Sequence, residues 1–195
     1  MFHINMKILL TLFVLLFSSS VFAEDISDFE IGEMSIGDSL LNYFSKDEIE
    51  NAPNYDDYPS DMKFRIIEIE SKDKFYDVFQ FYYIPNDNKF IIQSLNGRKF
   101  YNDINDCYNK KKEIEKSLSV TFNNSEKRNT SKEKHPDDPS GKSTYTATYF
   151  LFDIGGRGSV TCYDMDRSTG FSKNIGVSIQ SKTVSDWVDS NYGLD

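Results

Sequence analysis

The two cysteines are the clearest candidates for a chemical role in this sequence, and their number favours a disulfide bond. Cys107 and Cys162 are the whole cysteine content of the 195-residue chain. An even number of cysteines in an oxidising compartment usually pairs. Zinc needs more ligands than two thiols and one loop histidine offer, and a catalytic thiol needs a suitably placed histidine. We therefore predict a disulfide between Cys107 and Cys162.

The other ionisable residues offer little for catalysis. His135 stands beside Pro136 in a polar stretch, and His3 belongs to a segment that we expect to be removed. Neither histidine is therefore a good candidate for Ser–His–Asp or Cys–His catalysis. The 31 acidic residues leave a carboxylate-dependent hydrolase open, because the sequence does not place any two carboxylates at a catalytic separation. We predict no catalytic residue.

Three short motifs resemble phosphate or metal sites and depart from the known patterns. Gly141-Lys142-Ser143 matches the end of a P-loop, but Pro136 occupies the place of its first glycine. Residues 189–195 alternate oxygen ligands like a calcium loop, yet the glycine comes one place early and no bidentate Glu follows. We interpret Asp164-Met165-Asp166 as a solvated turn. No cofactor and no metal are expected.

The first 23 residues have the pattern of a secretory signal peptide. Lys7 precedes an apolar run from Ile8 to Phe17, and Val21-Phe22-Ala23 fits a cleavage site. A run of about ten apolar residues is too short to cross about 30 Å of hydrocarbon. Glu24, rather than a cysteine, follows, which disfavours a lipid anchor. We expect export to the periplasm or the extracellular space, with no membrane anchor after cleavage.

The remaining chain, residues 24–195, is acidic and long enough for one domain with a sizeable core. Residues 1–23 hold one of the 22 basic residues and no acidic ones, so the rest carries a formal net charge of 21 − 31 = −10. An acidic exported domain is a poor partner for nucleic acid or for an anionic membrane surface. An unknown protein or small ligand is the expected partner.

One helix, within residues 102–122, must position the first cysteine. Its apolar residues recur at three- and four-residue steps, which indicates one buried face: Ile104, Cys107, Tyr108, Ile114, Leu118 and Phe122. Asn102 or Asp103 can cap its first turn. Lys111 lies on the apolar flank, where we expect its long side chain to extend towards water.

Strand-like runs lie on both sides of that helix. Before it they span 63–70, 75–84, 89–95 and 98–101, with a turn predicted at Asn96-Gly97; after it they span 145–153, 159–164 and 175–180. Short helices are expected after Ser35 and Ser45 and over 183–192. The predicted fold class is α+β, an antiparallel sheet built from two meanders around a central helix, with short N- and C-terminal helices. Residues 123–144 contain no large apolar residue, so we expect a mobile loop.

The run Met34-Ser35-Ile36-Gly37-Asp38-Ser39-Leu40-Leu41 resembles the opening helix of uncharacterised small exported bacterial proteins. More loosely, it is similar to the first helix of small outer-membrane lipoproteins of the barrel-assembly type. This chain departs from those lipoproteins because it lacks the lipid-bearing cysteine and is longer. The resemblance covers about ten residues and implies an exported compartment and an α+β fold, but no activity.

Aromatic residues are the remaining unusual feature, with 12 Tyr, 16 Phe and one Trp. The run from Phe75 to Tyr83 places rings on both faces of one strand. One face could pack under the helix while the other meets a ligand or a protein. Two-sided burial in a central strand is the alternative. We therefore propose Tyr76, Tyr82 and Tyr83 as a candidate binding surface of a non-catalytic module.

Overall fold

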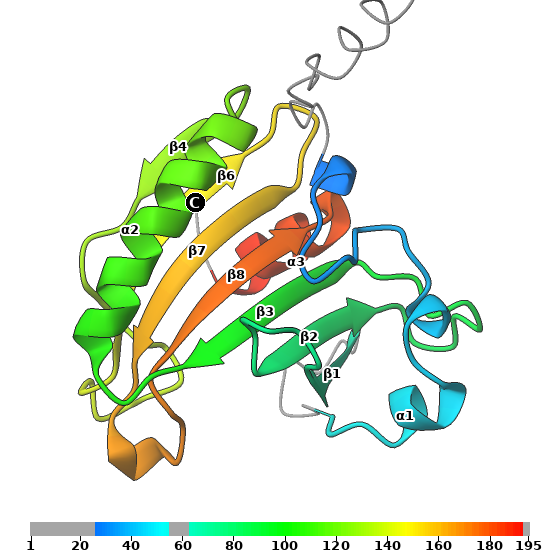
Figure 1. The fold of residues 1–195 in the computed structure, drawn as a ribbon, viewed down its shortest axis with the longest axis horizontal. Coiled ribbons are helices and arrows are strands. Elements are labelled where there is room, and N and C mark those ends of the chain that lie inside the picture. Colours follow the sequence, from blue (N-terminus) through cyan, green and yellow to red (C-terminus); the bar gives the residue numbers. More distant parts are fainter. Residues whose placement is uncertain (1–25, 55–62, 193–195) are drawn as a thin grey trace, which may run out of the picture.

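The computed structural model describes residues 26–54 and 63–192 (Figure 1). The predicted signal peptide and its cleavage site lie outside these residues. The described chain has the expected α+β class: an antiparallel sheet of eight strands carries helices on both of its faces. In chain order, the strands are β1 (Arg65–Glu70), β2 (Val78–Tyr83), β3 (Ser94–Phe100), β4 (Glu126–Asn129), β5 (Glu133–Lys134), β6 (Thr144–Leu151), β7 (Arg157–Asp164) and β8 (Asn174–Gln180).

The sheet has the spatial order β1-β2-β3-β8-β7-β6-β4, and β5 also pairs with β6. Strands that follow one another in the chain are neighbours within β1–β3 and within β6–β8. The antiparallel pairing of β3 with β8, from Ser94 opposite Gln180 to Phe100 opposite Asn174, joins the two groups. Residues that precede and follow the long helix α2 therefore lie side by side at the centre of the sheet.

Helix α2 (Ile104–Thr121) covers one face of the sheet, mainly over β7 (Figure 1). The side chain of Asp103 caps it by accepting a hydrogen bond from the backbone N–H of Asn105. Cys107, Leu118 and Phe122 are buried, as their spacing predicted. These side chains join the main core, in which Phe79, Phe81 and Tyr83 of β2 point to the same face, as expected from strand alternation.

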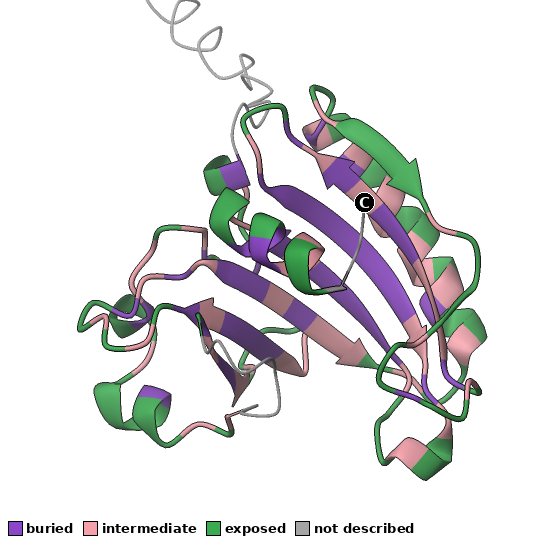
Figure 2. Cartoon of the chain, turned by 180° about the vertical axis from the view of Figure 1, so that it is seen from behind, coloured by how far each residue is buried: buried purple, intermediate pink, exposed green. Residues whose placement is uncertain are grey.

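Helix α3 (Lys182–Tyr192) covers the opposite face, which Figure 2 shows from behind. Val184 and Trp187 of this helix pack with Phe64 in a second, smaller cluster, and Tyr82 of β2 lies against it. The guanidinium of Arg157 donates to Asp189 of α3 over 2.8 Å and to Gln180 of β8 over 2.7 Å. The two faces of β2 are thus covered by different parts of the chain.

The N-terminal segment contains the 3-10 turns η1 (Ile26–Asp28) and η2 (Leu40–Asn42) and the short helix α1 (Lys46–Glu50). Ser45 and Glu48 form a capping box at the start of α1, where a short helix was expected. The helix expected after Ser35 is limited to the 3-10 turn η2, because β-like hydrogen bonds to residues 90–92 use backbone groups of residues 37–40. Gly37 N–H donates to Ile92, and Leu40 N–H donates to Phe90, each over 3.0 Å.

Asn96-Gly97 does not form the predicted turn but lies inside β3, with Gly97 between Phe79 of β2 and Val177 of β8. The glycine is required by packing rather than by a turn. A Cβ at this position would come within 2.6 Å of the ring of Tyr76. The two short strands expected at 89–95 and 98–101 are replaced by the single strand β3.

Residues 123–144, expected as a mobile loop, contain β4 and β5, which pair with β6. Strand pairing uses backbone groups, so this segment needs no large apolar side chain to extend the sheet. A polar turn follows: the carboxylate of Asp138 accepts hydrogen bonds from the backbone N–H groups of Ser140 and Ser143 over 2.9 and 2.7 Å. Composition alone missed this arrangement, because it reports side-chain burial and not backbone pairing.

Candidate functional site

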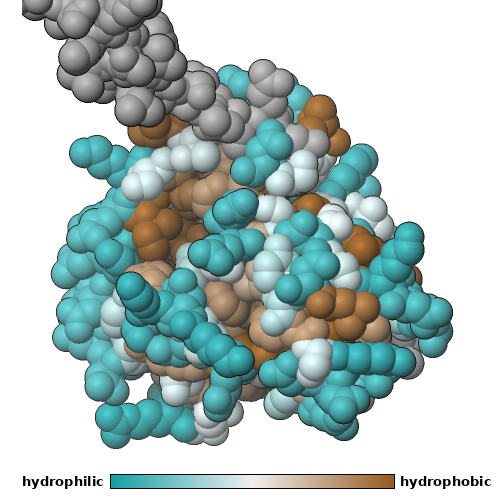
Figure 3. All heavy atoms as spheres, turned by 45° about the vertical axis from the view of Figure 1, so that its right-hand side comes forward, coloured by the Kyte–Doolittle hydropathy of each residue, from teal (hydrophilic) through white to brown (hydrophobic). Residues whose placement is uncertain are grey.

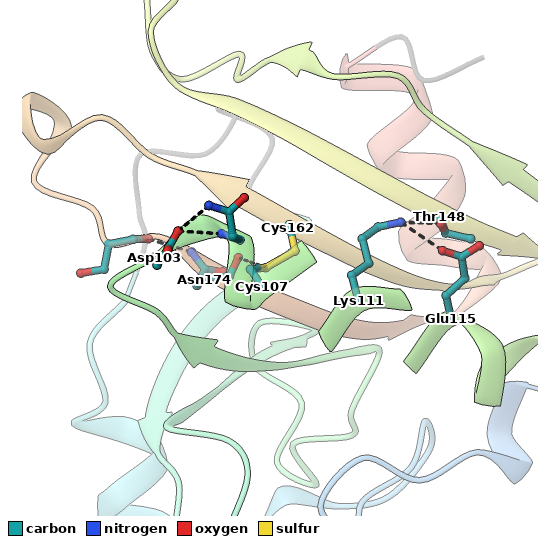
Figure 4. Close-up of a disulfide and its surroundings, with 9 residues drawn as sticks. Asp103, Cys107, Lys111, Glu115, Thr148, Cys162 and Asn174 are labelled. Carbon is teal, nitrogen blue, oxygen red and sulfur yellow. Dashed lines mark hydrogen bonds and ion pairs between the residues drawn. A yellow bond between two sulfur atoms is a disulfide. The ribbon is translucent and has the colours of Figure 1, made fainter. Parts of the chain in front are cut away.

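A disulfide fixes the first turns of α2 to the sheet (Figure 4). The Sγ atoms of Cys107 in α2 and Cys162 in β7 are bonded at 2.02 Å, and the Cα atoms are 6.0 Å apart. Both cysteines are fully buried. The pair that the sequence indicated is therefore joined, and it holds the first turns of the helix against β7.

A largely buried lysine, Lys111, attaches α2 to the sheet one turn farther along (Figure 4). Lys111 was expected to extend towards water, but only 12% of its side chain is exposed. Its ammonium donates to Thr148 of β6 over 2.6 Å and lies 3.5 Å from Glu115, which also pairs with Lys127. Burial lowers the pKa of Lys111. The partners on β6 and on the helix itself compensate for the water that the ammonium loses.

A cleft of about 400 Å³ lies on the same face of the sheet, between α2 and the aromatic side chains of two other segments. Its volume is within the usual range of small-molecule sites, about 300–1,000 Å³. Figure 3 shows apolar surface in a hollow of this face, bordered by hydrophilic side chains. The residues that line the cleft are Phe29, Phe75, Tyr76, Lys110, Glu113, Ile114, Ser117, Leu118, Thr121 and Val177.

The cleft combines an apolar interior with a polar rim from one flank of α2. The rings of Phe75 and Tyr76 are 4.9 Å apart and meet edge to face. The ammonium of Lys110 lies 5.5 Å from the centroid of the Phe75 ring and donates to Glu113 over 2.8 Å. Ser117, one turn beyond Glu113, adds a hydroxyl to the same rim. Such a site suits a ligand with an apolar body and a polar end.

Tyr76 is the one tyrosine among the residues that line the cleft. Burial raises the pKa of Tyr76 above its ordinary value of 10.0, and the nearby carboxylate of Asp73 acts in the same direction. The phenol is thus protonated at neutral pH, which its ordinary pKa already ensures.

The three tyrosines proposed from the sequence lie in three different environments. Tyr76 lines the cleft. Tyr82 lies on the opposite face of the sheet, with its ring centroid 6.5 Å from that of Phe64. Tyr83 is 3% exposed and packs against Phe90 in the core. The structure thus places one of the three at the candidate site and brings no two of them together there.

Sequence reasoning missed the other residues of the cleft. Ile114 and Leu118 were correctly assigned to the apolar face of the helix, and the four-residue step from Glu113 to Ser117 and Thr121 could have marked the rim beside them. Phe29 and Val177 carried no such signal. Each is far from α2 in sequence, and only the folded chain brings them to it.

Other candidate groups have structural partners. Glu113 is the one carboxylate among the residues that line the cleft, whereas two-carboxylate hydrolysis needs a pair. His135 packs against the rings of Tyr145 and Tyr163, and burial lowers its pKa. Within residues 26–54 and 63–192, no group of three or more His, Cys, Asp or Glu side chains could hold a metal ion. No helix of this described part is long and apolar enough to span a bilayer.

Comparison with known proteins adds no residue assignment to this site. No protein-family model, curated protein or solved structure matches the chain. The geometry of the cleft therefore carries the functional proposal.

Proposed function

We propose that this protein is an exported, non-catalytic binding module that takes a small, largely apolar ligand into the cleft beside α2. The observation that carries the proposal is the cleft itself, about 400 Å³ in volume and lined by aromatic and aliphatic side chains from separate segments. A concave apolar site with a few polar groups is the usual form of a small-molecule site.

Partly exposed apolar groups supply the driving force for this binding. Phe29, Phe75, Tyr76 and Ile114 pack against the main core but are only half-buried. A ligand in the cleft would remove part of their remaining apolar surface from water, and each Å² of buried apolar surface contributes about 25 cal/mol. The disulfide and the Lys111 contacts keep α2 in place, so little ordering of the protein is needed on binding.

Export is the second part of the proposal. The disulfide between Cys107 and Cys162 fits a protein of an oxidising compartment, the periplasm or the extracellular space. The signal-like residues 1–23 supply the route, and we expect the exported protein to begin at Glu24. The intact mass of protein recovered from the periplasm or the medium shows whether the chain begins at Glu24. Protein that retains Met1 and remains in the cytoplasm would contradict export.

Ligand binding is tested with the uncharged fluorescent probe N-phenyl-1-naphthylamine, whose emission rises in apolar sites. The wild-type protein should bind it saturably at one site. Ser117→Trp should abolish binding, because an indole at this rim position fills the cleft. Lys116→Trp is the matched control: residue 116 is exposed on the same helix, does not line the cleft, and should keep the wild-type affinity.

Two outcomes would count against the proposal. Equal probe binding by Ser117→Trp and Lys116→Trp would show that the probe occupies another surface. Absence of saturable binding by the wild-type protein would remove the support for a small-ligand site. A secreted hydrolase that uses carboxylates is the alternative function, and chemical conversion of a bound ligand, rather than its recovery unchanged, would favour that alternative.

A further inference from the structure

We infer that the ligand of this cleft is an amphiphilic anion whose acidic group is bound by Lys110. This inference rests on the proposed binding function and specifies its ligand class. Lys110 is the one cationic residue among those that line the cleft, and it stands at the rim of an otherwise largely apolar site. A ligand with an apolar body and one acidic end would bury the body and pair the acid with this ammonium.

The position of the ammonium favours an anion at this point. Lys110 Nζ lies 5.5 Å from the centroid of Phe75, whose ring in turn contacts Tyr76. The ammonium stays accessible beside this ring, since 38% of the Lys110 side chain is exposed, so the acidic group of a ligand can reach it. The next lysine of the helix, Lys111, is not available, because Thr148 and Glu115 already contact its ammonium away from the cleft.

Glu113 is the group that the ligand would replace. The carboxylate of Glu113 pairs with Lys110 over 2.8 Å, but 67% of its side chain is exposed. Exposed pairs three residues apart on a helix contribute little to stability. Glu113 can therefore turn into water when a ligand acid takes its place, so the exchange costs little. The same carboxylate repels an incoming anion until it moves.

Because the chain is acidic as a whole, the binding of an anion to the cleft depends on the local positive charge of Lys110. The exported chain, residues 24–195, carries a formal net charge of 21 − 31 = −10, so the protein as a whole repels anions. Because long-range attraction is absent, retention of an anionic ligand depends on a short-range partner within the site. Loss of the Lys110 charge should therefore strongly weaken the affinity for the anionic ligand. The affinity for an uncharged analogue of the same shape should change very little.

Two probes with one skeleton separate charge from apolar contact. 8-Anilinonaphthalene-1-sulfonate carries an anionic group on the skeleton of the uncharged N-phenyl-1-naphthylamine. Lys110→Met should weaken binding of the sulfonate about three- to tenfold and leave the affinity for the uncharged probe within about twofold. Lys112→Met removes the same charge from an exposed position on the same helix that does not line the cleft, and it should change neither affinity.

Glu113→Gln provides a second, opposite readout. This variant removes the competing carboxylate and should strengthen binding of the sulfonate by about twofold or more without affecting the uncharged probe.

Decanoate should displace the bound sulfonate at lower concentration than decanol does, because the carboxylate also pairs with Lys110. The result with decanoate would extend the preference from a sulfonate to the carboxylate of an aliphatic amphiphile.

The outcomes distinguish this inference from the proposed function. If the uncharged probe binds but Lys110→Met and Lys112→Met have equal affinities for the sulfonate, Lys110 does not select an anion and the inference is wrong. The binding function would stand in that case. If neither probe binds the wild-type protein at the cleft, the proposed function fails and the inference fails with it.

Discussion

The ring of Tyr76 lies directly over Gly97, so close that a Cβ at residue 97 would be 2.6 Å from Cδ1 and 2.7 Å from Cε1 of the tyrosine. Gly97 belongs to β3 and pairs with Val177 of β8, which contributes to the lining of the cleft. The missing side chain at residue 97 thus makes room for the ring that forms one wall. This close approach connects the sequence of a central strand to the shape of the candidate site.

Gly97→Ala should reduce both stability and ligand binding. The added methyl group displaces the Tyr76 ring, and overpacking of this kind costs about 1–3 kcal/mol of unfolding free energy. Because the ring is also a wall of the cleft, the affinity for N-phenyl-1-naphthylamine should fall as well. Gly170→Ala is the comparison, since φ is +77° there but nothing lies within 4 Å. It should lose about 1 kcal/mol and keep the wild-type affinity, and equal affinity in both variants would contradict this wall of the cleft.

Removal of the disulfide should strongly destabilise the protein. Cys107 and Cys162 are 55 residues apart in sequence, and closing a loop of that size restricts the unfolded chain. The Cys107→Ala/Cys162→Ala double variant should lose up to about 4 kcal/mol in urea unfolding. Intact mass of the wild-type protein after alkylation in denaturant without reductant should show no modified cysteine. Two alkylated cysteines in exported protein would refute the bond.

The stability contributed by Asp138 should depend on pH. Hydrogen bonds from Ser140 and Ser143 lower the pKa of the Asp138 carboxyl below its ordinary value of 3.8. A group whose pKa is depressed by folding stabilises the protein above the unfolded value, and this contribution is lost as pH falls through the folded value. Asp138→Asn should therefore lower Tm at pH 7, and its difference from the wild-type protein should narrow progressively below pH 3.8.

Asp137→Asn is the matched control for this pH effect. Asp137 is exposed, and its carboxylate lies 4.0 Å from Nδ1 of His135. The control variant should have nearly the wild-type Tm at pH 7, because Asp137 is exposed and burial lowers the pKa of His135, which disfavours a charged partner for it. If thermal unfolding gives the same Tm for both variants at pH 7, the hydrogen bonds of Asp138 contribute no net stability.

Replacement of residues 123–144 by a short Gly/Ser linker tests two opposed expectations. The composition of the segment predicts a change of Tm of only a few degrees. The structure favours a larger fall, because the linker removes β4 and β5 from the edge of β6 and the hydrogen bond from Ala147 N–H to the Thr130 hydroxyl. Differential scanning calorimetry should show a fall of about 5 °C or more. A smaller change would support the expectation from composition.

The sequence predicted correctly those features that depend on one element at a time. Three- and four-residue spacing located α2 and its buried side. Of the two caps considered for α2, Asn102 and Asp103, the structure has Asp103, and the short helix expected after Ser45 is capped by that serine. Alternation in β2 correctly placed Phe81 and Tyr82 on opposite faces. Cysteine count indicated the bond between Cys107 and Cys162, since two cysteines allow one intramolecular pairing.

Tertiary contacts decided the rest. The dipeptide Asn96-Gly97 is by itself typical of a turn. In the fold it lies within a strand, where the ring of Tyr76 needs the space that a glycine leaves. The charge of Lys111 favoured an exposed ammonium, yet Thr148 of a distant strand binds it beside the core. The cleft depends even more on the fold, because Phe29, Tyr76, Ile114 and Val177 come from four separate segments. The periodicity of apolar residues indicates which side of an element is buried. The packing of whole elements against one another determines which residues come into contact.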